Sequence, residues 1–461
     1  MTSSSPSGPY PGRAAVAGWV LFDCATQPVF TLITTFIFAP FFAARIADNP
    51  VEGQSLWGFA TGTAGFAIAF LSPVLGAVAD AAGRRKPWIA AFSLLILAGC
   101  ALLWFAVPGA GYAVPLAMVA FAMATIGAEF ATVFTNAMMP TLVPPSQLGR
   151  LSGTGWAVGY AGGLVSLALM LALFVASPET GRTLAGLVPV FGLDPATGEG
   201  DRASGPFSAL WYLVFVLPLF LFTPDTPRLQ PVAKAVSGGI ATLKATIVHA
   251  AAQGNIFLYL LAHMIYADGL VGLFAFGGIY ATGIFGWSTT EIGAFGILLT
   301  TTGALGAFLG GRLDDRLGPK TVVLGALAGL ILAGTGILST TSGSILFGVA
   351  VAPPVPGDGL FAAPAEQFYL LCGLVIGAVA GPLQAASRTL LIRISPEDRI
   401  TQFFGLYALA GKVTSFLCPM LVGAVTALAA SQRAGMTVLL VFFVVGALLL
   451  MRVKVPAAKR A

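Results

Sequence analysis

Residues 76–86 read GAVADAAGRRK, and residues 311–320 read GRLDDRLGPK. Both stretches follow an apolar run, and both contain the pattern G-x-x-x-D-x-x-G with a basic residue after it. The glycines permit a tight turn and a close approach of two helices. The aspartate can pair with the basic residues or with a neighbouring helix N-terminus. Two copies of one loop indicate a chain that is built from two similar halves.

We expect each copy to work as a conformational latch between helix ends. The alternative is that the basic residues only mark one side of a membrane. The residues of the two proposed latches are Gly76, Asp80, Gly83, Arg84 and Arg85 in the first copy and Gly311, Asp315, Gly318 and Lys320 in the second.

A longer repeat supports the same division. One offset of 252 residues pairs Pro144 with Pro396, Gly153 with Gly405, Gly159 with Gly411, Asn136 with Arg388, and Tyr160 with Lys412. Two halves with parallel repeats are the layout of major facilitator transporters, whose site lies near the middle of the bilayer between the halves.

The composition is that of a membrane protein. The 461 residues include only 23 basic and 18 acidic side chains, or 9% charged residues, and 57% are hydrophobic. A soluble domain carries about 25% charged residues. These figures exclude a water-soluble enzyme, a nucleic-acid-binding protein and a disulfide-stapled secreted domain. The four cysteines lie in apolar stretches without metal-ligand spacing, so we expect neither a metal site nor disulfides.

Hydropathy predicts twelve membrane-spanning helices, because the apolar runs are near the length that crosses a hydrocarbon core of about 30 Å and lack the alternation of a barrel. The predicted spans are residues 14–44, 56–82, 87–107, 112–139, 147–176, 208–222, 253–283, 289–317, 320–340, 366–393, 399–428 and 433–452. Seventeen of the 23 basic residues lie on the side that carries the N-terminus, and four lie on the other side. This bias predicts cytoplasmic N- and C-termini.

The spans divide the chain into two halves of six helices. We expect a cytoplasmic tail over 1–13, an N-terminal half over 14–222, a central cytoplasmic loop over 223–252, a C-terminal half over 253–452 and a second tail over 453–461.

Five ionisable residues lie within the predicted spans, where a charge is costly and marks a functional site by default. They are Asp23, Glu129, Asp268, Arg388 and Lys412. At helical spacing, several of them share one face of the helix with other polar or aromatic residues. Neighbours on these faces are Trp19 and Gln27 beside Asp23, Asn136 beyond Glu129, and Gln384 before Arg388.

Four stretches carry a resemblance to a known family. They are GWVLFDCATQPVF (18–30), TNAMMPTLVPPSQLGRLSGTGWAVGYAGG (135–163), MIYADGLVGLFAFGGIYA (264–281), and QAASRTLL (384–391) with QFFGLYALAGKVTSF (402–416). The chain resembles the vacuole effluxer family, which is related to the vacuolar amino-acid exporters of fungi and their bacterial homologues. It departs from the family's usual Asp-Trp-Ala-Asn-Ser pattern, with Asp23-Cys24-Ala25-Thr26-Gln27 in the first helix. The resemblance implies a major facilitator fold and export of amino acids.

Two roles fit the ionisable residues. Arg388 and Lys412 can hold an anionic group, and Arg388 offers a bidentate fork to a carboxylate or phosphate. Asp23, Glu129 or Asp268 can carry a proton, because burial favours the neutral form of a carboxyl group. The alternative is that these charges form structural pairs between helices, for example Asp268 with Lys412.

The expected substrate-binding residues are Arg388, Gln384, Lys412, Asn136, Trp19, Gln27 and Tyr160. His263 is five residues before Asp268 and therefore not on its face, so we expect a packed, hydrogen-bonded histidine.

The sequence therefore predicts an all-α membrane protein with the major facilitator fold. We expect a proton-coupled secondary transporter that moves a small anionic or zwitterionic solute, such as an amino acid, by alternating access. The alternatives are a transporter of lipid-like or peptide- or sugar-derived substrates and a non-transporting membrane receptor that keeps the fold. We expect no enzymatic activity, no cofactor and no nucleic-acid partner. We expect a monomer in the plasma membrane, the inner membrane of a bacterium, whose partners are a small-molecule substrate, a proton and the lipid bilayer.

Overall fold

The computed structural model describes residues 10–81, 84–144, 148–225, 254–355, 359–395, 407, 410–411 and 413–455. The chain forms two compact units. The N-terminal unit comprises residues 1–38 and 70–243, and the C-terminal unit comprises residues 39–69 and 244–461. One long helix, α3 (Pro50–Ala81), begins in the C-terminal unit and ends in the N-terminal unit.

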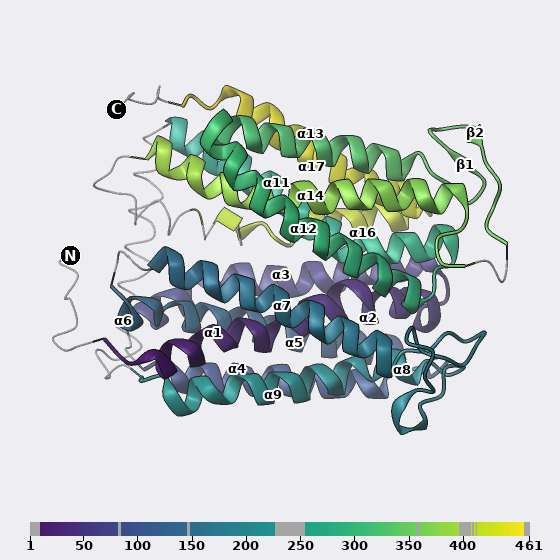
Figure 1. The fold of residues 1–461 in the computed structure, drawn as a ribbon, viewed down its shortest axis with the longest axis horizontal. Helices are drawn as coiled ribbons and strands as arrows, with labels where there is room; N and C mark the ends of the chain where they lie inside the picture. The colour runs from purple at the N-terminus through teal and green to yellow at the C-terminus, as the bar shows by residue number, and fades with distance from the viewer. Residues whose placement is uncertain are drawn as a thin grey trace. The chain divides into compact units, whose positions relative to one another are not determined.

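In the described residues of the N-terminal unit there are five long helices besides the end of α3, which Figure 1 shows. Its elements are α1 (Arg13–Pro28), the π-helix η1 (Val29–Phe36), α4 (Lys86–Leu102), η3 (Leu103–Phe105), α5 (Ala113–Asn136), α6 (Met139–Leu142), α7 (Leu148–Leu173), η5 (Val190–Gly192), α8 (Glu199–Arg202) and α9 (Ser204–Phe222).

The C-terminal unit contains the start of α3 and the helices that follow the central part of the chain. Its other elements, with α2 beginning at the boundary, are α2 (Phe38–Phe41), the π-helix η2 (Phe42–Ile46), α11 (Gly254–Phe285), α12 (Thr289–Leu317), α13 (Pro319–Leu338), α14 (Pro364–Ile394), α16 (Leu417–Ala429), α17 (Gln432–Arg452) and a small antiparallel hairpin of β1 (Ser344–Ile345) and β2 (Val349–Ala350).

The two units repeat the same helix pairings. In the N-terminal unit α1 packs on α7 and α9, and α4 packs on α5 and α9. In the C-terminal unit α11 packs on α16 and α17, and α13 packs on α14 and α17. Each of these four pairings in one unit has its counterpart at the corresponding helix of the other, as the repeated loops indicate.

Ten helical segments of the described chain are long and apolar enough to cross a membrane. The helix is the expected form because every backbone N–H and C=O must find its partner within a span. The described residues therefore confirm an all-helical, multi-pass membrane protein. The number twelve and the cytoplasmic position of both termini stay predictions.

Most observed helices lie close to the predicted spans, but the first span is not one continuous α-helix. Pro28 ends α1, and the eight residues that follow form the π-helix η1. Proline has no N–H to donate, which disrupts the regular ladder. The hydroxyls of Thr34 and Thr35 donate to the carbonyls of Val29 and Phe30, five residues back, at 3.0 and 2.9 Å. A π-helical turn in a long helix is frequently found beside a functional site.

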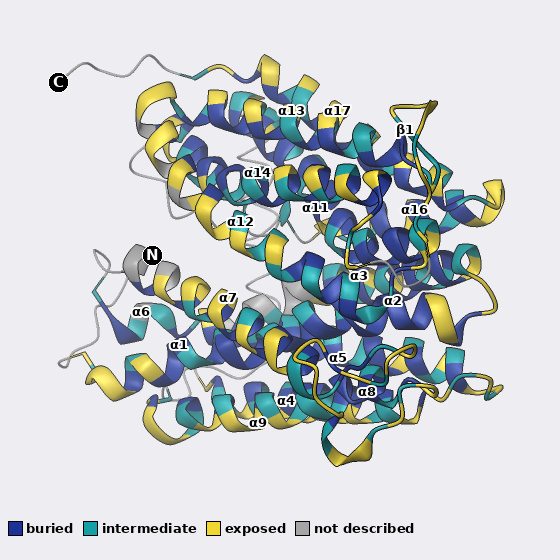
Figure 2. Ribbon diagram, turned by 45° about the vertical axis from the view of Figure 1, so that its right-hand side comes forward, coloured by how far each residue is buried: buried dark blue, intermediate teal, exposed yellow. Residues whose placement is uncertain are grey.

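The surfaces of the outer helices are apolar. Figure 2 shows exposed residues along α9 and α12, and these include Leu221 and Leu305, whose exposed fractions are 70% and 60%. α1, by contrast, is largely buried within its unit. Exposed leucines on a membrane helix are suited to contact with lipid, because lipid tails are as apolar as the leucine side chain.

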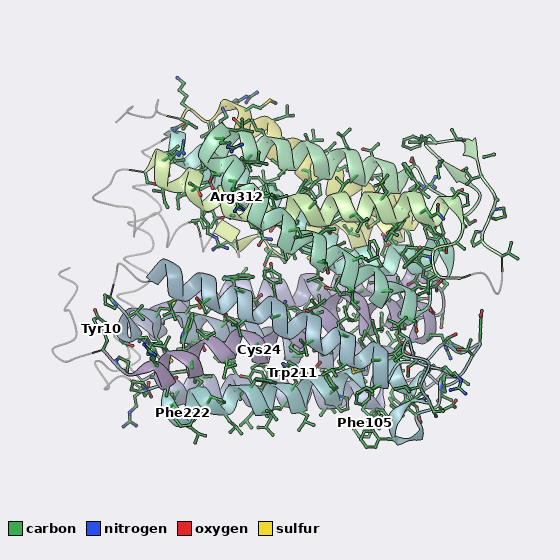
Figure 3. All side chains as sticks on the ribbon, in the orientation of Figure 1. Tyr10, Cys24, Phe105, Trp211, Phe222 and Arg312 are labelled. Carbon is green, nitrogen blue, oxygen red and sulfur yellow. The ribbon has the colours of Figure 1, made fainter. Side chains whose placement is uncertain are left out.

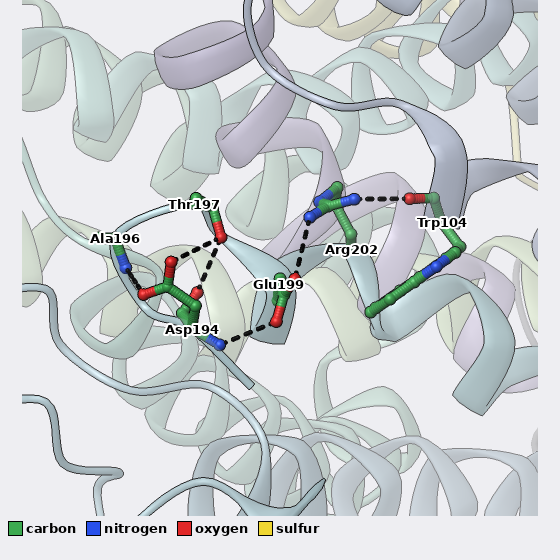
Figure 4. A network of polar contacts seen from close by, with 6 residues as sticks. All are labelled: Trp104, Asp194, Ala196, Thr197, Glu199 and Arg202. Atoms are coloured by element: carbon green, nitrogen blue, oxygen red, sulfur yellow. Dashed lines mark hydrogen bonds and ion pairs between the residues drawn. The ribbon is translucent and has the colours of Figure 1, made fainter. Parts of the chain in front are cut away.

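The connection before α9 is fixed by a polar network (Figure 4). Arg202 donates to the carbonyl of Trp104 at 2.9 Å, forms an ion pair with Glu199 at 3.8 Å and lies over the Trp104 ring at 5.0 Å. The Glu199 carboxylate in turn accepts from the backbone of Asp194 at 2.9 Å. Arg202 is 5% exposed, so its charge is neutralised where it is buried.

Candidate functional site

The predicted polar face of α1 packs against α7. The indole of Trp19 donates to the carbonyl of Thr135, at the end of α5, at 2.7 Å. Asp23 is half-buried and faces two glycines of α7. A Cβ at Gly155 would collide with the Asp23 carboxylate, and a Cβ at Gly159 would lie 3.3 Å from the Asp23 Cβ. The absence of side chains on α7 therefore makes the room that Asp23 occupies.

The same seam continues one turn further along α1. Gly162 faces the thiol of Cys24, and Gly163 faces Gln27. Gln27 donates to the Thr31 hydroxyl at 3.4 Å. On the other side of α1, Trp211 of α9 donates to the Cys24 carbonyl at 2.9 Å; both residues are labelled in Figure 3.

The other predicted residues of the N-terminal unit lie on α5 and α7. Glu129 is half-buried on α5, and Asn136 is exposed at the end of that helix, next to the residue that binds Trp19. Tyr160 is 45% exposed and contacts Trp156 with ring centroids 5.7 Å apart. Tyr160 therefore lies on an exposed aromatic face of α7.

In the C-terminal unit, Arg388 of α14 lies in a cluster of aromatic and hydroxyl groups. The Tyr407 hydroxyl is within hydrogen-bonding reach of the Arg388 guanidinium and of the Ser387 hydroxyl. The His263 ring stacks on the Tyr407 ring, with centroids 3.9 Å apart and planes 30° apart. Arg388 is close enough to His263 for its positive charge to act on the imidazole. A cation, a phenol and an imidazole thus converge from α14, α11 and residue 407.

Ser387, the neighbour of Arg388, holds this cluster to α11. The Tyr266 hydroxyl lies 2.7 Å from the Ser387 hydroxyl, which in turn donates to the Leu383 carbonyl at 2.6 Å. The Tyr259 hydroxyl donates to the Ser387 carbonyl. All three side chains are almost fully buried, so these bonds form without competition from water. They fix the turn of α14 that carries Arg388.

The structure confirms that His263 is packed, while its hydrogen bonding stays a prediction. The ring is packed, at 7% exposure. Its Nδ1 atom is buried but has no hydrogen-bond partner in the described part of the chain. The ring is held by its stacking on Tyr407 and by an edge-to-face contact with Tyr266 at 5.3 Å.

Asp268 is the most deeply buried of the predicted carboxyl groups, at 1% exposure. It lies near Cys418, and the Thr414 hydroxyl faces it, but neither carboxyl oxygen completes a hydrogen bond in the described residues. Gln384 is half-buried and makes a long contact of 3.5 Å with the Ala380 carbonyl. Lys412, the proposed partner of Asp268, lies outside the described residues.

At the predicted latches, the structure shows lysines that hold helix ends. Lys86, after the first loop, donates to the Phe220 carbonyl at the end of α9 at 2.8 Å. Lys320, after the second loop, donates to the carbonyls of Met451 and Val453 at the end of α17, at 2.9 and 2.7 Å. A cation at a helix C-terminus is stabilised by the helix dipole.

The rest of each latch is seen in part. The Arg85 backbone N–H donates to the Asp225 carboxylate at 2.9 Å, and Arg84 is exposed. Gly318, with φ of 82°, makes the turn between α12 and α13, in a region of φ that glycine tolerates. Gly83 and the surroundings of Gly76 and Gly311 lie outside what the structure describes, as do the side chains of Asp80 and Asp315, so the aspartate pairs stay a prediction.

Several site residues are not evident from the sequence. Tyr259, Tyr266 and Ser387 look like ordinary residues of apolar helices, and only the fold brings them together. Lys86 had a usable signal, because it follows its loop as Lys320 follows the second copy. Asp225, in the TPDTP stretch, had no comparable signal.

A family model described as vacuole effluxer Atg22-like matches residues 43–461. An uncharacterised MFS-type transporter of Bacillus subtilis, YxiO, is 23% identical over 439 residues, which cover 94% of this chain and 93% of that protein. Autophagy-related protein 22 of Cryptococcus neoformans is 28% identical over 321 residues, which cover 68% of this chain and 51% of that protein. The chain thus spans about half the length of the fungal relative.

Solved structures share the fold. A D-xylose–proton symporter matches with a TM-score of 0.63 at 18% identity, over 97% of each chain. A bacterial homologue of the human lysosomal transporter Spinster, in an inward-facing conformation, matches with a TM-score of 0.60 at 18% identity, over 95% of each chain. At these identities the likeness establishes the major facilitator fold alone.

Proposed function

We infer the function of this chain from its family: it belongs to the vacuole effluxer Atg22-like family of major facilitator transporters, whose model matches it from residue 43 to residue 461. We propose that it is a proton-coupled secondary transporter of a small solute that carries a carboxylate, such as an amino acid. We also propose export as its direction, which the family's description as effluxers supports.

The observation that carries the substrate class is the surroundings of Arg388. A guanidinium binds a carboxylate through two parallel hydrogen bonds, and this planar match favours arginine over lysine. Ser387, Tyr259 and Tyr266 set the orientation of the α14 backbone at this point. Tyr407 adds a hydroxyl beside the cation. This arrangement supports a solute with one anionic group and a body that can contact aromatic rings.

Asp268 supports proton coupling. An isolated carboxylate in apolar surroundings costs far more free energy than a protonated carboxyl group. Asp268 is buried on a membrane helix with Thr414 as the polar group that faces it, so a proton can neutralise it in one conformation and leave in another. Asp23 is the second candidate, because it is half-buried in a membrane helix against two glycines of α7.

The substrate must first be found among candidate solutes. We propose a thermal-shift screen of the purified chain against amino acids, organic acids, peptides, phosphorylated compounds and lysolipids. Hits are then tested for flux in proteoliposomes, with and without a pH gradient. Transport of a neutral sugar or a lysolipid, with no response to carboxylates, would overturn the proposed substrate class.

Replacement of Arg388 by alanine tests the carboxylate site. A charge-assisted hydrogen bond contributes about 1.5–3 kcal/mol, so the Arg388→Ala variant should bind the solute roughly 10- to 100-fold more weakly. Arg388→Lys should recover part of the loss, because it restores the charge but not the fork. Arg316→Ala removes an exposed arginine of α12 and serves as the control. Unchanged affinity in Arg388→Ala would exclude this residue from the site.

The Asp268→Asn variant tests coupling separately from binding. Asparagine keeps the shape of the side chain but cannot take up a proton. We expect solute binding to persist and exchange of solute across the membrane to continue, while accumulation driven by a pH gradient is lost. If Asp268→Asn still accumulates solute in response to the gradient, the same measurement on Asp23→Asn decides whether the first helix carries the proton.

A further inference from the structure

A cavity with polar lining residues lies at the end of the C-terminal unit where α11 and α13 finish and α17 begins. It has a volume of about 250 Å³. Its lining residues are Tyr280, Ile284, Thr340, Thr341, Ser342, Gln432 and Arg433. Arg388 and Asp268 are not among them. The predicted topology places this cavity on the outer side of the membrane, because α11 starts at the end of the unit that carries Lys454.

Arg433 brings a positive charge to this cavity that no described carboxylate neutralises. Its guanidinium donates to the Thr340 carbonyl at 3.1 Å, and it has no ion pair in the described part of the chain. Arg202 of the N-terminal unit makes the contrast clear (Figure 4), because Glu199 and the Trp104 ring occupy its guanidinium. A guanidinium has five N–H donors, so Arg433 keeps donors for an anion.

A buried hydroxyl beside Arg433 also lacks a partner. Tyr280 is 1% exposed, and its hydroxyl lies beside the Arg433 guanidinium without completing a hydrogen bond in the described residues. A buried polar atom without a partner costs about 1–3 kcal/mol. A bound oxygen at this point would accept from both groups and remove that cost.

We propose that this cavity is a second binding site, separate from the site around Arg388, for a small anion that bears a carboxylate or phosphate group. Arg433 binds the anionic oxygens, Tyr280 donates to one of them, and the Thr341 and Ser342 hydroxyls surround the rest. The volume limits the ligand to a small anion, because cavities for drug-sized molecules start at about 300 Å³. Gln432, which lines the cavity, also donates to the Pro50 carbonyl at 2.8 Å and so ties the site to the start of α3.

The test uses the purified full-length chain with Arg388→Ala already introduced, so that anion binding at Arg388 does not contribute. Thermal unfolding is followed by tryptophan fluorescence over a concentration series of sodium succinate or of inorganic phosphate, with sodium chloride at matched ionic strength as the reference. A ligand that binds the folded state raises the unfolding midpoint along a saturation curve.

We expect a saturable rise with at least one anion. Arg433→Gln should abolish it, and Tyr280→Phe should raise the half-saturating concentration about fivefold, as for one lost hydrogen bond. Arg182→Gln, which removes an exposed arginine of the N-terminal unit, should leave the curve unchanged. Saturation with succinate alone identifies a carboxylate site, and saturation with phosphate alone identifies a phosphate site.

Two results would overturn the proposal: the absence of saturation with either anion, or saturation that persists in Arg433→Gln. If Arg433→Gln does not fold, Ser342→Phe fills the cavity while Arg433 remains, and it should abolish the response. Because these measurements use Arg388→Ala, they stand whether or not Arg388 binds the transported solute.

Discussion

Lys86 and Lys320 show how a single residue works at the same place in both units. Each follows the repeated glycine-rich loop, and each donates to backbone at a helix end of its own unit: Lys86 to one carbonyl of α9, and Lys320 to two carbonyls at the end of α17. Those carbonyls have no partners within their helix, so the lysine completes their hydrogen bonds. Its positive charge is also stabilised by the negative end of the helix dipole. These hydrogen bonds therefore join the start of α4 to the end of α9 in the N-terminal unit, and the start of α13 to the end of α17 in the C-terminal unit.

Replacement of Lys320 by methionine should weaken this attachment. The change removes two hydrogen bonds of a half-buried ammonium group and keeps the apolar stem, so we expect a loss of about 1–2 kcal/mol in unfolding free energy. The measurement is the unfolding midpoint of the purified chain. Lys454→Met is the control, because no described residue pairs with its side chain. Equal midpoints for the two variants would contradict the role of Lys320.

For single residues, the sequence identifies the charged side chains of the candidate site better than it identifies the residues that surround them. Arg388 and Asp268 are conspicuous because each interrupts an apolar run. The Tyr266 hydroxyl is not, because a tyrosine in an apolar helix has the same pattern whether it packs or binds. The stacking of His263 on Tyr407 also joins residues 144 positions apart, and no local period reveals such a contact.

At the scale of helices, the seam between α1 and α7 positions the N-terminal part of the site. Glycines of α7 lie against the polar face of α1, so the helix backbones approach closely and Asp23 has room. Small residues have this role in membrane helices because packing drives their association. The ends of most spans are predictable from hydropathy. The break at Pro28 and the π-helix after it are not, because a shift from four-residue to five-residue hydrogen bonds leaves the apolar pattern unchanged.

The Gly155→Ala variant tests this seam. The new methyl group would collide with the Asp23 carboxylate and lie 3.2 Å from the Trp19 ring. Overpacking of this kind costs about 1–3 kcal/mol, more than the gain in helix propensity. We therefore expect a lower unfolding midpoint and slower transport.

Gly325→Ala provides the matched control, because its Cβ meets nothing within 4 Å in the middle of α13. There the gain in helix propensity of about 0.5–1 kcal/mol should act alone and keep or raise the midpoint. A Gly155→Ala variant as stable as Gly325→Ala would show that α7 can yield, which would contradict close packing on Asp23.

At the scale of the molecule, α3 belongs to both units. Its first part packs on α16 within the C-terminal unit: Gln54 donates to the Thr426 hydroxyl at 2.8 Å, and a Cβ at Gly58 would lie 2.7 Å from the Gly423 Cα. Gln54 also donates to the Gln432 carbonyl at 3.1 Å. If transport proceeds by alternating access between the two units, residues 39–69 move with the C-terminal unit, so we expect this attachment to stay closed throughout the cycle.

A reversible cross-link between Gln54→Cys and Thr426→Cys tests that expectation. The four native cysteines, all buried, are first replaced by alanine. A short, cleavable thiol reagent should then leave solute flux unchanged, because both residues belong to one unit. The control joins Asn255→Cys to Lys454→Cys, two residues that hydrogen-bond to each other within the C-terminal unit. A loss of flux with a complete 54–426 cross-link, reversed by reduction, would contradict an attachment that stays closed.

The division of α3 also means that residues 39–69, which come early in the sequence, pack with residues from the C-terminal part of the chain. A cut anywhere between residues 225 and 254 separates the peptide into two pieces, yet the first piece still contains residues 39–69, which pack with the second. Fragments made by such a cut should therefore co-purify when they are expressed together. The C-terminal fragment alone should lack a partner for Thr426 and Gln432, and we expect it to be the less stable of the two products.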